Sequence, residues 1–305
     1  MLQRFYTRMN IKMGNIEQLS LFDIELPPMQ EATEIKKKDE EKIQRVNPNN
    51  EIKSFARVPK EEYTNWKLPG KIPKVTDILK LVKQGTYRVG VHKMLSDIFE
   101  CGAIAISNRF DKMNAEKREK RYLQIIKQYD KGTQQLMVEI FTQIYLLLTN
   151  QIHGEIGLRD YLGELYMQLD VSNKNAGQFF TPYDVSKLCA KLTINKSTVW
   201  ECIEQDRILT LNEPACGSGG MVIAAADVLY NDYQFNIARN LLVECSDIDA
   251  RCIHMSYLQL GLAGIPAIIY QRDTLTMETW DRWETPAYIM QWHRFKDCLR
   301  ERENA

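Results

Sequence analysis

A glycine-rich loop between two regular elements is the part of the chain best suited to bind a ligand. Residues 207–211 are mostly apolar and predict a short strand, whereas residues 222–230 contain neither Gly nor Pro and predict a helix. Between them, residues 212–220 read Asn-Glu-Pro-Ala-Cys-Gly-Ser-Gly-Gly. A glycine-rich turn from a strand into a helix presents backbone N–H groups and the positive helix end to a ligand. Because Glu213 ends the strand, we expect a ligand that is cationic or carries hydroxyl groups, and not a phosphate.

Two further apolar runs, each followed by acidic residues, extend this pattern. Residues 241–249 read Leu-Leu-Val-Glu-Cys-Ser-Asp-Ile-Asp and predict a second strand that ends in acids. Residues 267–270 predict a third strand, which Asp273 follows closely. An acid after the second strand of a βαβ unit typically binds ribose hydroxyls. Upstream, the sequence Gly-Gln-Phe-Phe-Thr-Pro at 177–182 predicts a turn into another helix.

These four segments, in this order, resemble the adenine-N6 DNA methyltransferases, and especially the modification subunits of type I restriction systems. The resemblance covers roughly residues 155–276, and it implies S-adenosylmethionine as the cofactor. It further implies that Asp247 binds the ribose hydroxyls, that Asp273 binds the adenine amino group, and that the glycine-rich loop surrounds the methionine portion. The implied cofactor-binding residues are Phe180, Thr181, Glu213, Ala215, Gly217, Gly219, Asp247, Ile248 and Asp273. The alternative is an ordinary α/β layer whose acids bind no ligand.

The catalytic motif of that family, Asn-Pro-Pro-Phe or Asp-Pro-Pro-Tyr, is not found after Asp273. Methylation of an exocyclic amine requires the base to be flipped out of the stack, with its amine held and its ring stacked. The nearest local sequence provides the weak candidates Thr285, Pro286 and Tyr288. It offers a hydroxyl where the family has an amide or carboxylate oxygen. The segment is therefore either a degenerate catalytic loop or an unrelated sequence, and the catalytic residues stay unknown.

The residues after Asp273 suffice for about one further βαβ unit, which needs roughly 30 residues, and residues 291–304 are charged without a strand pattern. We therefore predict an α/β protein in which an N-terminal helical domain precedes a partial Rossmann-like methyltransferase core. The resemblance implies adenine-N6 methylation of double-stranded DNA. The alternative is a catalytically silent cofactor-binding or scaffold subunit, which acts with a specificity or completing subunit in DNA modification or replication.

The predicted domain boundaries follow composition and apolar spacing. Residues 1–60 are polar and charged and predict a disordered tail. A helical domain is expected at 61–172, the truncated core at 173–290 and a charged tail at 291–305. Within the helical domain, the apolar spacing predicts helices over 77–84, 92–109, 114–129, 134–150 and 160–169. The basic run at 117–121 is interpreted as a solvated face, with DNA contact as the alternative.

Composition excludes several classes of protein. Hydrophobic residues make up 44% of the chain and charged residues 26%, as in a globular protein that dissolves in water. Lys and Arg together number 40, as do Asp and Glu, so there is no overall positive charge to attract nucleic acid. The seven Cys lack paired spacing and the four His are scattered, which favours free thiols and no metal site. The absence of a signal peptide or membrane span predicts a cytoplasmic protein without membrane contact.

A pentapeptide stands out in the polar N-terminal region. It consists of Gln18, Leu19, Ser20, Leu21 and Phe22. It resembles the peptide by which bacterial DNA-processing proteins dock on the replicative sliding clamp. Leu21 and Phe22 would fill an apolar pocket while Gln18 sets the register. The alternatives are a short anchor on the protein's own helical domain, or chance.

Overall fold

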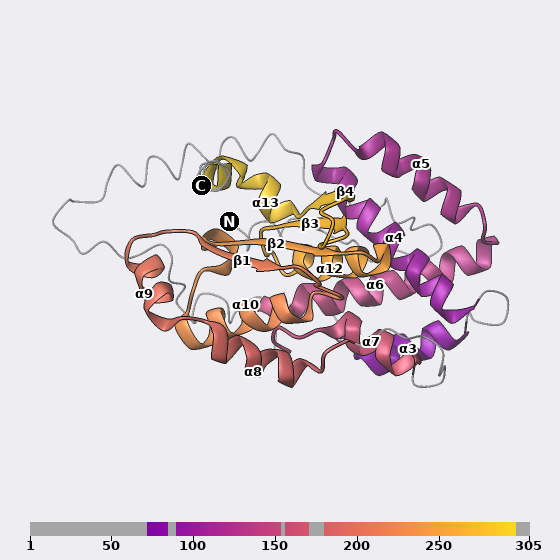
Figure 1. Cartoon of the computed structure of the whole chain (residues 1–305). Coiled ribbons are helices and arrows are strands. Elements are labelled where there is room, and N and C mark those ends of the chain that lie inside the picture. Colours follow the sequence, from indigo (N-terminus) through magenta and orange to yellow (C-terminus); the bar gives the residue numbers. More distant parts are fainter. Residues whose placement is uncertain (1–71, 85–89, 154–155, 171–179, 297–305) are drawn as a thin grey trace, which may run out of the picture. The chain divides into compact units, whose positions relative to one another are not determined.

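The computed structural model describes residues 72–84, 90–153, 156–170 and 180–296 (Figure 1). All of them fall within the unit Phe55–Ala305. The unit combines many helices with a four-stranded sheet, so the predicted α/β class is confirmed. The pentapeptide at 18–22 and the expected tail at 1–60 lie outside the described residues.

Helices form over the segments for which apolar spacing predicted them. In the first helix, Val75, Ile78, Leu79 and Val82 are buried, which is the spacing of one helix face. The charge distribution suits its ends, because Asp77 lies in the first turn and Lys83 in the last. The helices before the sheet are α3 (Val75–Gln84), α4 (Val91–Phe110), α5 (Ala115–Ile126), α6 (Lys131–His153) and α7 (Tyr161–Asp170).

The sheet has the strand order β1-β2-β3-β4. Strands β1 (Leu209–Glu213), β2 (Leu241–Asp247) and β3 (Ala267–Arg272) are parallel, and Val243 is the neighbour of both Leu211 and Ala267. Strand β2 is buried along most of its length, as expected of a parallel strand covered on both faces. Strand β4 (Thr279–Glu284) runs antiparallel to β3. The sequence predicted the first three strands but not the fourth.

Helices connect the parallel strands, as such crossovers require. They are α10 (Gly220–Tyr233) and the short α11 (Ile237–Asn240) between β1 and β2, and α12 (Ala250–Leu262) between β2 and β3. Before the sheet, α8 (Tyr183–Thr193) packs against α10, and α9 (Lys196–Glu204) leads into β1. Figure 1 shows α10 and α12 on one side of the sheet and α13 (Pro286–Met290) on the other.

Helix α12 lies between the sheet and the N-terminal helices. Every residue from Cys252 to Leu262 is buried. The helix contacts β2 and β3 on one side and α4, α6 and α7 on the other. A helix that is buried all round must be covered by several elements at once. The sheet and the N-terminal helices therefore share one core.

The opposite face of the sheet is covered by residues near the end of the described chain. Leu242 and Ile268 of the sheet pack against Tyr288 and Phe295. The ring of Tyr288 stacks on that of Phe295 at 5.9 Å. Arg294 also donates a hydrogen bond to the backbone oxygen of Asp206 at 3.0 Å. Phe295 is thus packed against the sheet, although the sequence suggested a charged tail beginning at 291.

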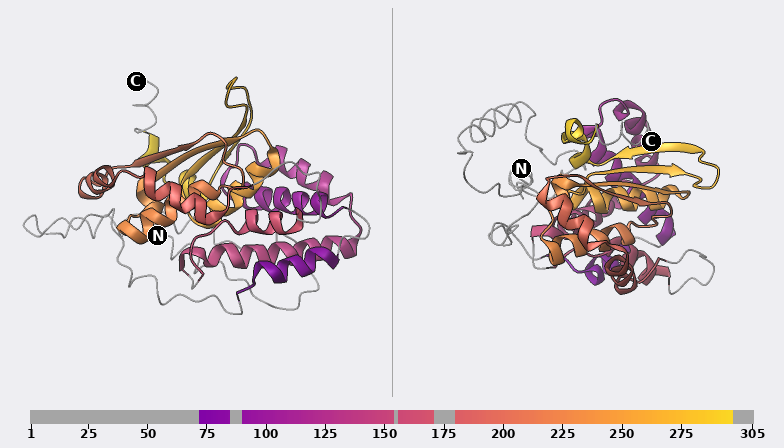
Figure 2. Two further views of the ribbon diagram at one scale, coloured as in Figure 1. Left: turned by 60° about the horizontal axis from the view of Figure 1, so that its bottom comes forward. Right: turned by 60° about the vertical axis from the view of Figure 1, so that its left-hand side comes forward.

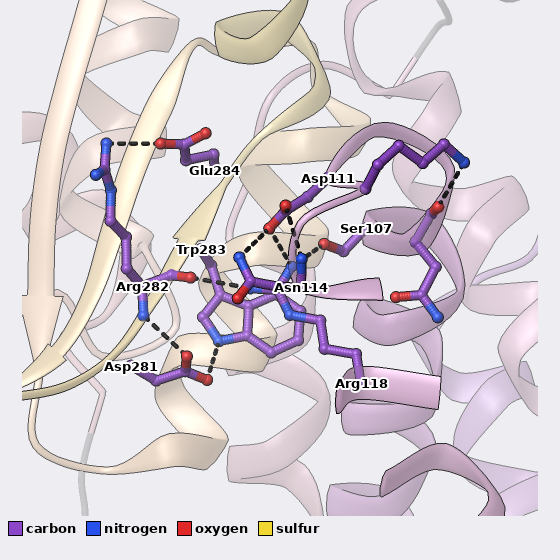
Figure 3. A network of polar contacts seen from close by, with 10 residues as sticks. Ser107, Asp111, Asn114, Arg118, Asp281, Arg282, Trp283 and Glu284 are labelled. Atoms are coloured by element: carbon purple, nitrogen blue, oxygen red, sulfur yellow. Dashed lines mark hydrogen bonds and ion pairs between the residues drawn. The ribbon is translucent and has the colours of Figure 1, made fainter. Parts of the chain in front are cut away.

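A buried arginine joins helix α5 to strand β4 (Figure 3). Arg118 donates hydrogen bonds to Ser107, to Asp111 at 2.7 Å and to the backbone oxygen of Arg282 at 2.9 Å. Its guanidinium lies 3.9 Å from the ring centre of Trp283. Burial would raise the pKa of Asp111, but hydrogen bonds from Asn114 and the charge of Arg118 lower it below its ordinary value.

The basic run at 117–121 is largely engaged within the protein. Arg118 is buried, Lys120 pairs with Glu116 at 2.7 Å, and Arg121 pairs with Glu100 at 2.6 Å. The interpretation of this run as a solvated face therefore fits Lys120 and Arg121 but not Arg118. In the described part of the chain, no helix is long and apolar enough to cross a membrane, and no group of three or more acidic, His or Cys side chains is arranged to hold a metal.

Candidate functional site

The acids predicted to contact a ligand meet at one edge of the sheet. Glu213 ends β1, Asp247 ends β2 and Asp273 directly follows β3. Because these strands are parallel neighbours, their carboxyl ends lie together, where α/β sheets bind ligands. The negative charge of the three carboxylates favours a ligand with a positive charge.

The glycine-rich loop adopts a backbone that its glycines permit. Gly217 has φ +54° and Gly219 has φ +91°, both in the left-handed region that favours glycine. A Cβ at position 217 would come within 3.1 Å of the Phe180 ring. Gly219 immediately precedes α10, whose first residue is Gly220. The loop therefore brings backbone N–H groups and a helix N-terminus to the same edge as the acids.

The loop and the acids hold one another in place. Asp247 accepts hydrogen bonds from the backbone N–H of Gly217 and of Asp249, each at 2.9 Å. Oε1 of Glu213 accepts from the N–H of Ala215 at 3.2 Å. Oδ1 of Asp273 accepts from the N–H of Leu275 at 2.8 Å. Each carboxylate is thus oriented by the backbone and retains acceptor capacity for a ligand.

Exposed apolar side chains accompany these acids. Ile248, next to Asp247, is 61% exposed, and Leu275, two residues after Asp273, is 96% exposed. Figure 2 shows the β3–β4 hairpin, which carries Leu275, extending beyond the neighbouring helices. Ligand sites combine apolar side chains with a few polar groups that fix the orientation of the ligand.

The residues of the upstream turn reach the loop through an aromatic contact. The rings of Phe180 and Tyr166 meet edge to face at 5.7 Å, and Phe180 also lies against Gly217. Thr181 lies just before Pro182, the N-cap of α8, and is exposed, whereas residues 177–179 lie outside the described part. The hydroxyl of Tyr166 accepts a hydrogen bond from Arg251 at 2.9 Å. A hydrogen bond to Asp249 raises the pKa of Arg251, although burial opposes the shift.

Tyr166 and Arg251 were not predicted as site residues. Tyr166 lies within the helix that was predicted over 160–169, and Arg251 was not considered in the sequence. The sequence did contain one indication for Tyr166: a tyrosine hydroxyl on an otherwise apolar, buried helix face usually requires a hydrogen-bond partner.

A buried polar cluster beneath the loop was also missed. Asp160, just before α7, accepts hydrogen bonds from the Ser218 hydroxyl at 2.5 Å and from Gln259 Nε2 at 2.7 Å. Gln259 Nε2 donates to the backbone oxygen of Ser218 as well, also at 2.7 Å. The cluster links α7, the glycine-rich loop and α12. Its members lie too far apart in sequence for spacing to reveal it.

The structure does not bring the weak catalytic candidates to this edge. Thr285 Oγ1 donates to the backbone oxygen of Ile265 and accepts from the N–H of Ala267, both at 2.8 Å. Ala267 begins β3, so Thr285 lies at the opposite end of this strand from Asp273. The six residues of β3 span roughly 17–20 Å. In this arrangement Thr285 precedes α13, Pro286 opens it, and Tyr288 is only 1% exposed.

Comparison with known proteins bears on the same part of the chain. Residues 158–303 match the family model described as N-6 DNA Methylase. A solved structure, the methyltransferase subunit of the type I restriction-modification system from Streptococcus thermophilus, is similar at 18% sequence identity and a TM-score of 0.36. The similarity covers 68% of this chain and 40% of that chain. No curated protein matched in sequence. The family match confirms that this part of the chain resembles the adenine-N6 DNA methyltransferases, as its motifs predicted.

Proposed function

We propose that the edge formed by the ends of β1, β2 and β3 binds S-adenosylmethionine. The observation that carries the proposal is the meeting of Glu213, Asp247 and Asp273 around a loop that needs glycine at Gly217 and Gly219. This cofactor has a cationic methionine portion, a ribose with two hydroxyls and a flat adenine ring. An acidic edge with a helix N-terminus and exposed apolar side chains suits all three parts.

Each residue at the edge receives a role under this proposal. Asp247, already oriented by backbone N–H groups, accepts hydrogen bonds from the ribose hydroxyls. Asp273 accepts one from the adenine amino group, and Ile248 packs on the ring. Glu213 faces the cationic methionine portion. Phe180, Thr181 and the loop residues Ala215, Gly217 and Gly219 enclose that portion and exclude water. When bound, the cofactor supplies the methyl group.

The proposed reaction is methylation of adenine N6 in double-stranded DNA by a cytoplasmic protein. The family match over residues 158–303 supports this substrate class. The second candidate, a cofactor-binding subunit that is silent by itself, is favoured by the position of Thr285 and Tyr288. Both are buried, and the Thr285 hydroxyl is bound at the amino end of β3. We therefore expect that a specificity or completing subunit provides the groups that hold the flipped adenine.

Two measurements test these proposals. In calorimetry, folded protein should bind S-adenosylmethionine, and a lack of heat up to millimolar cofactor would remove the proposal. The protein is then incubated with labelled cofactor and mixed DNA. The single chain should transfer methyl groups very slowly or not at all, and addition of host extract should make the transfer faster. Rapid turnover by the single chain would contradict the need for a partner. If Tyr288→Ala then abolished that turnover while leaving the protein folded, Tyr288 would be part of a working catalytic loop.

A further inference from the structure

Asp160 carries a buried charge that no cation neutralises within the described residues. Its exposed fraction is 5%, and no ion pair of the described part includes it. Three donors hold the carboxylate instead. The N–H of Gly163 at 2.8 Å and Nε2 of Gln259 at 2.7 Å donate to Oδ1, and the hydroxyl of Ser218 donates to Oδ2 at 2.5 Å. Burial of a charge is costly unless such hydrogen bonds compensate it.

Two helix ends also stabilise the charge. Asp160 immediately precedes α7, a helix of ten residues, and bonds an N–H of its first turn. A Cβ at Gly220, the first residue of α10, would lie 2.7 Å from Oδ2 of Asp160. The positive ends of both helices therefore face the carboxylate.

The charge lies directly behind the proposed cofactor edge. Gly217 donates its N–H to Asp247 at that edge, and the next residue, Ser218, donates its hydroxyl to Asp160. Consecutive Cα atoms are about 3.8 Å apart, so the carboxylate lies within roughly 10 Å of the edge. At an effective dielectric of about 20, unit charges about 10 Å apart interact strongly enough to change an affinity roughly tenfold.

We propose that Asp160 is a specificity-determining residue that makes the site prefer a cationic cofactor to its neutral counterpart. This inference rests on the proposed function. S-adenosylmethionine and its demethylated product, S-adenosylhomocysteine, share every group except the methyl group and the positive charge on sulfur. A fixed negative charge behind the loop attracts the cation and has no such attraction for the neutral thioether. After methyl transfer, the product is therefore held less tightly and is replaced by fresh cofactor.

The variant Asp160→Asn removes the charge while retaining the hydrogen bonds. The amide oxygen accepts from Gly163 and Gln259, and the amide nitrogen donates to the hydroxyl of Ser218, which is able to accept. Calorimetry would compare the dissociation constants of S-adenosylmethionine, S-adenosylhomocysteine and sinefungin, whose ammonium group replaces the sulfonium. We expect Asp160→Asn to weaken both cations roughly tenfold and to change the neutral ligand less than about twofold.

Two control variants separate charge from structure. Ser218→Ala removes one hydrogen bond but keeps the charge, so it should weaken all three ligands by similar factors. Asp227→Asn removes a different buried carboxylate, which lies on α10. This carboxylate is already paired with Lys187 at 2.6 Å. The variant should leave the ratio between cationic and neutral ligands unchanged. Circular dichroism and thermal unfolding verify that each variant is folded.

The outcomes distinguish this inference from the proposed function. If folded wild-type protein binds none of the three ligands, the proposed function and this inference both fail. If Asp160→Asn weakens cationic and neutral ligands equally, Asp160 has only a structural role and this inference alone fails. Should the Asp160→Asn variant not fold, the affinities of the wild-type protein for the three ligands still test the inference. Tighter binding of S-adenosylhomocysteine than of both cations overturns the assigned role of Asp160.

Discussion

Replacement of Arg118 tests whether the buried arginine holds strand β4 against the helices. The change Arg118→Met keeps most of the side-chain volume but removes the charge and the guanidinium donors. Asp111 would then lose its 2.7 Å partner, and the backbone oxygen of Arg282 would lose its 2.9 Å donor. The face of Trp283 would also lose the cation that lies 3.9 Å from it.

The expected cost follows from burial. The Arg118 side chain is 5% exposed and that of Asp111 11% exposed. Removal of one partner from a buried ion pair costs about 3–5 kcal/mol, because the other charge stays buried without its counter-charge. Asn114 still donates hydrogen bonds to Asp111, so we expect the lower end of this range. For a chain of this size, a loss of about 3 kcal/mol lowers Tm by roughly 6–12 °C.

The assay is chemical denaturation followed by circular dichroism, with Lys120→Met as the matched control. Lys120 lies on the same helix, α5, and pairs with Glu116, but the two side chains are 71% and 85% exposed. Loss of such a surface pair should cost no more than about 1 kcal/mol. A cost below about 1 kcal/mol for Arg118→Met, or equal costs for the two variants, would refute the reasoning.

Three further predictions concern the site, pH and the N-terminal region. Asp247→Ala should weaken S-adenosylmethionine by roughly 1.5–3 kcal/mol in calorimetry, through loss of charge-assisted hydrogen bonds; an unchanged affinity would exclude the assigned ribose contact. Burial lowers the pKa of His254 to about 4, so the folded state resists protonation. Above pH 6.5, His254 is neutral in both the folded and the unfolded state, and the free energy of unfolding does not depend on it. As the pH falls from 6.5 toward 4, only the unfolded state binds the proton, and the free energy of unfolding decreases by up to about 3 kcal/mol. Denaturation at several pH values should show a shallower loss for His254→Gln, and identical slopes would count against this origin. Finally, if the pentapeptide at 18–22 docks on the sliding clamp, wild-type protein should co-elute with purified clamp and the double variant Leu21→Ala/Phe22→Ala should not. Equal behaviour of the two proteins would exclude clamp docking through this pentapeptide.

The features that the sequence predicted correctly are those determined by neighbouring residues. Strand β2 is a run of apolar residues that ends in acids, and the loop that contains Gly217 and Gly219 places glycine where positive φ requires it. Parallel pairing then brings Asp247 and Asp273 to one edge without further information. These elements were predictable because the physical cause lies within a few residues of its effect.

The features that were missed depend on contacts between distant segments. Strand β4 mixes Trp and Thr with charged residues, and it is joined to α5 by Arg118, whose bond to Arg282 spans 164 positions. Asp160 acquires its environment from Ser218, 58 positions away, and from Gln259, 99 positions away. Thr285 was considered as a catalytic candidate because a proline and an aromatic residue follow it. A short motif does not reveal at which end of a strand it lies.

The central position of α12 limits how this protein could have been assembled from parts. The N-terminal helices and the sheet each bury a different side of the same helix. Neither layer is therefore an exchangeable module, because a graft of either one from a relative must match the existing surface of α12 residue by residue. Sequence change on the two sides of this helix should be correlated over evolution, so that a substitution at a contact of α4 or α6 is accompanied by one in α12.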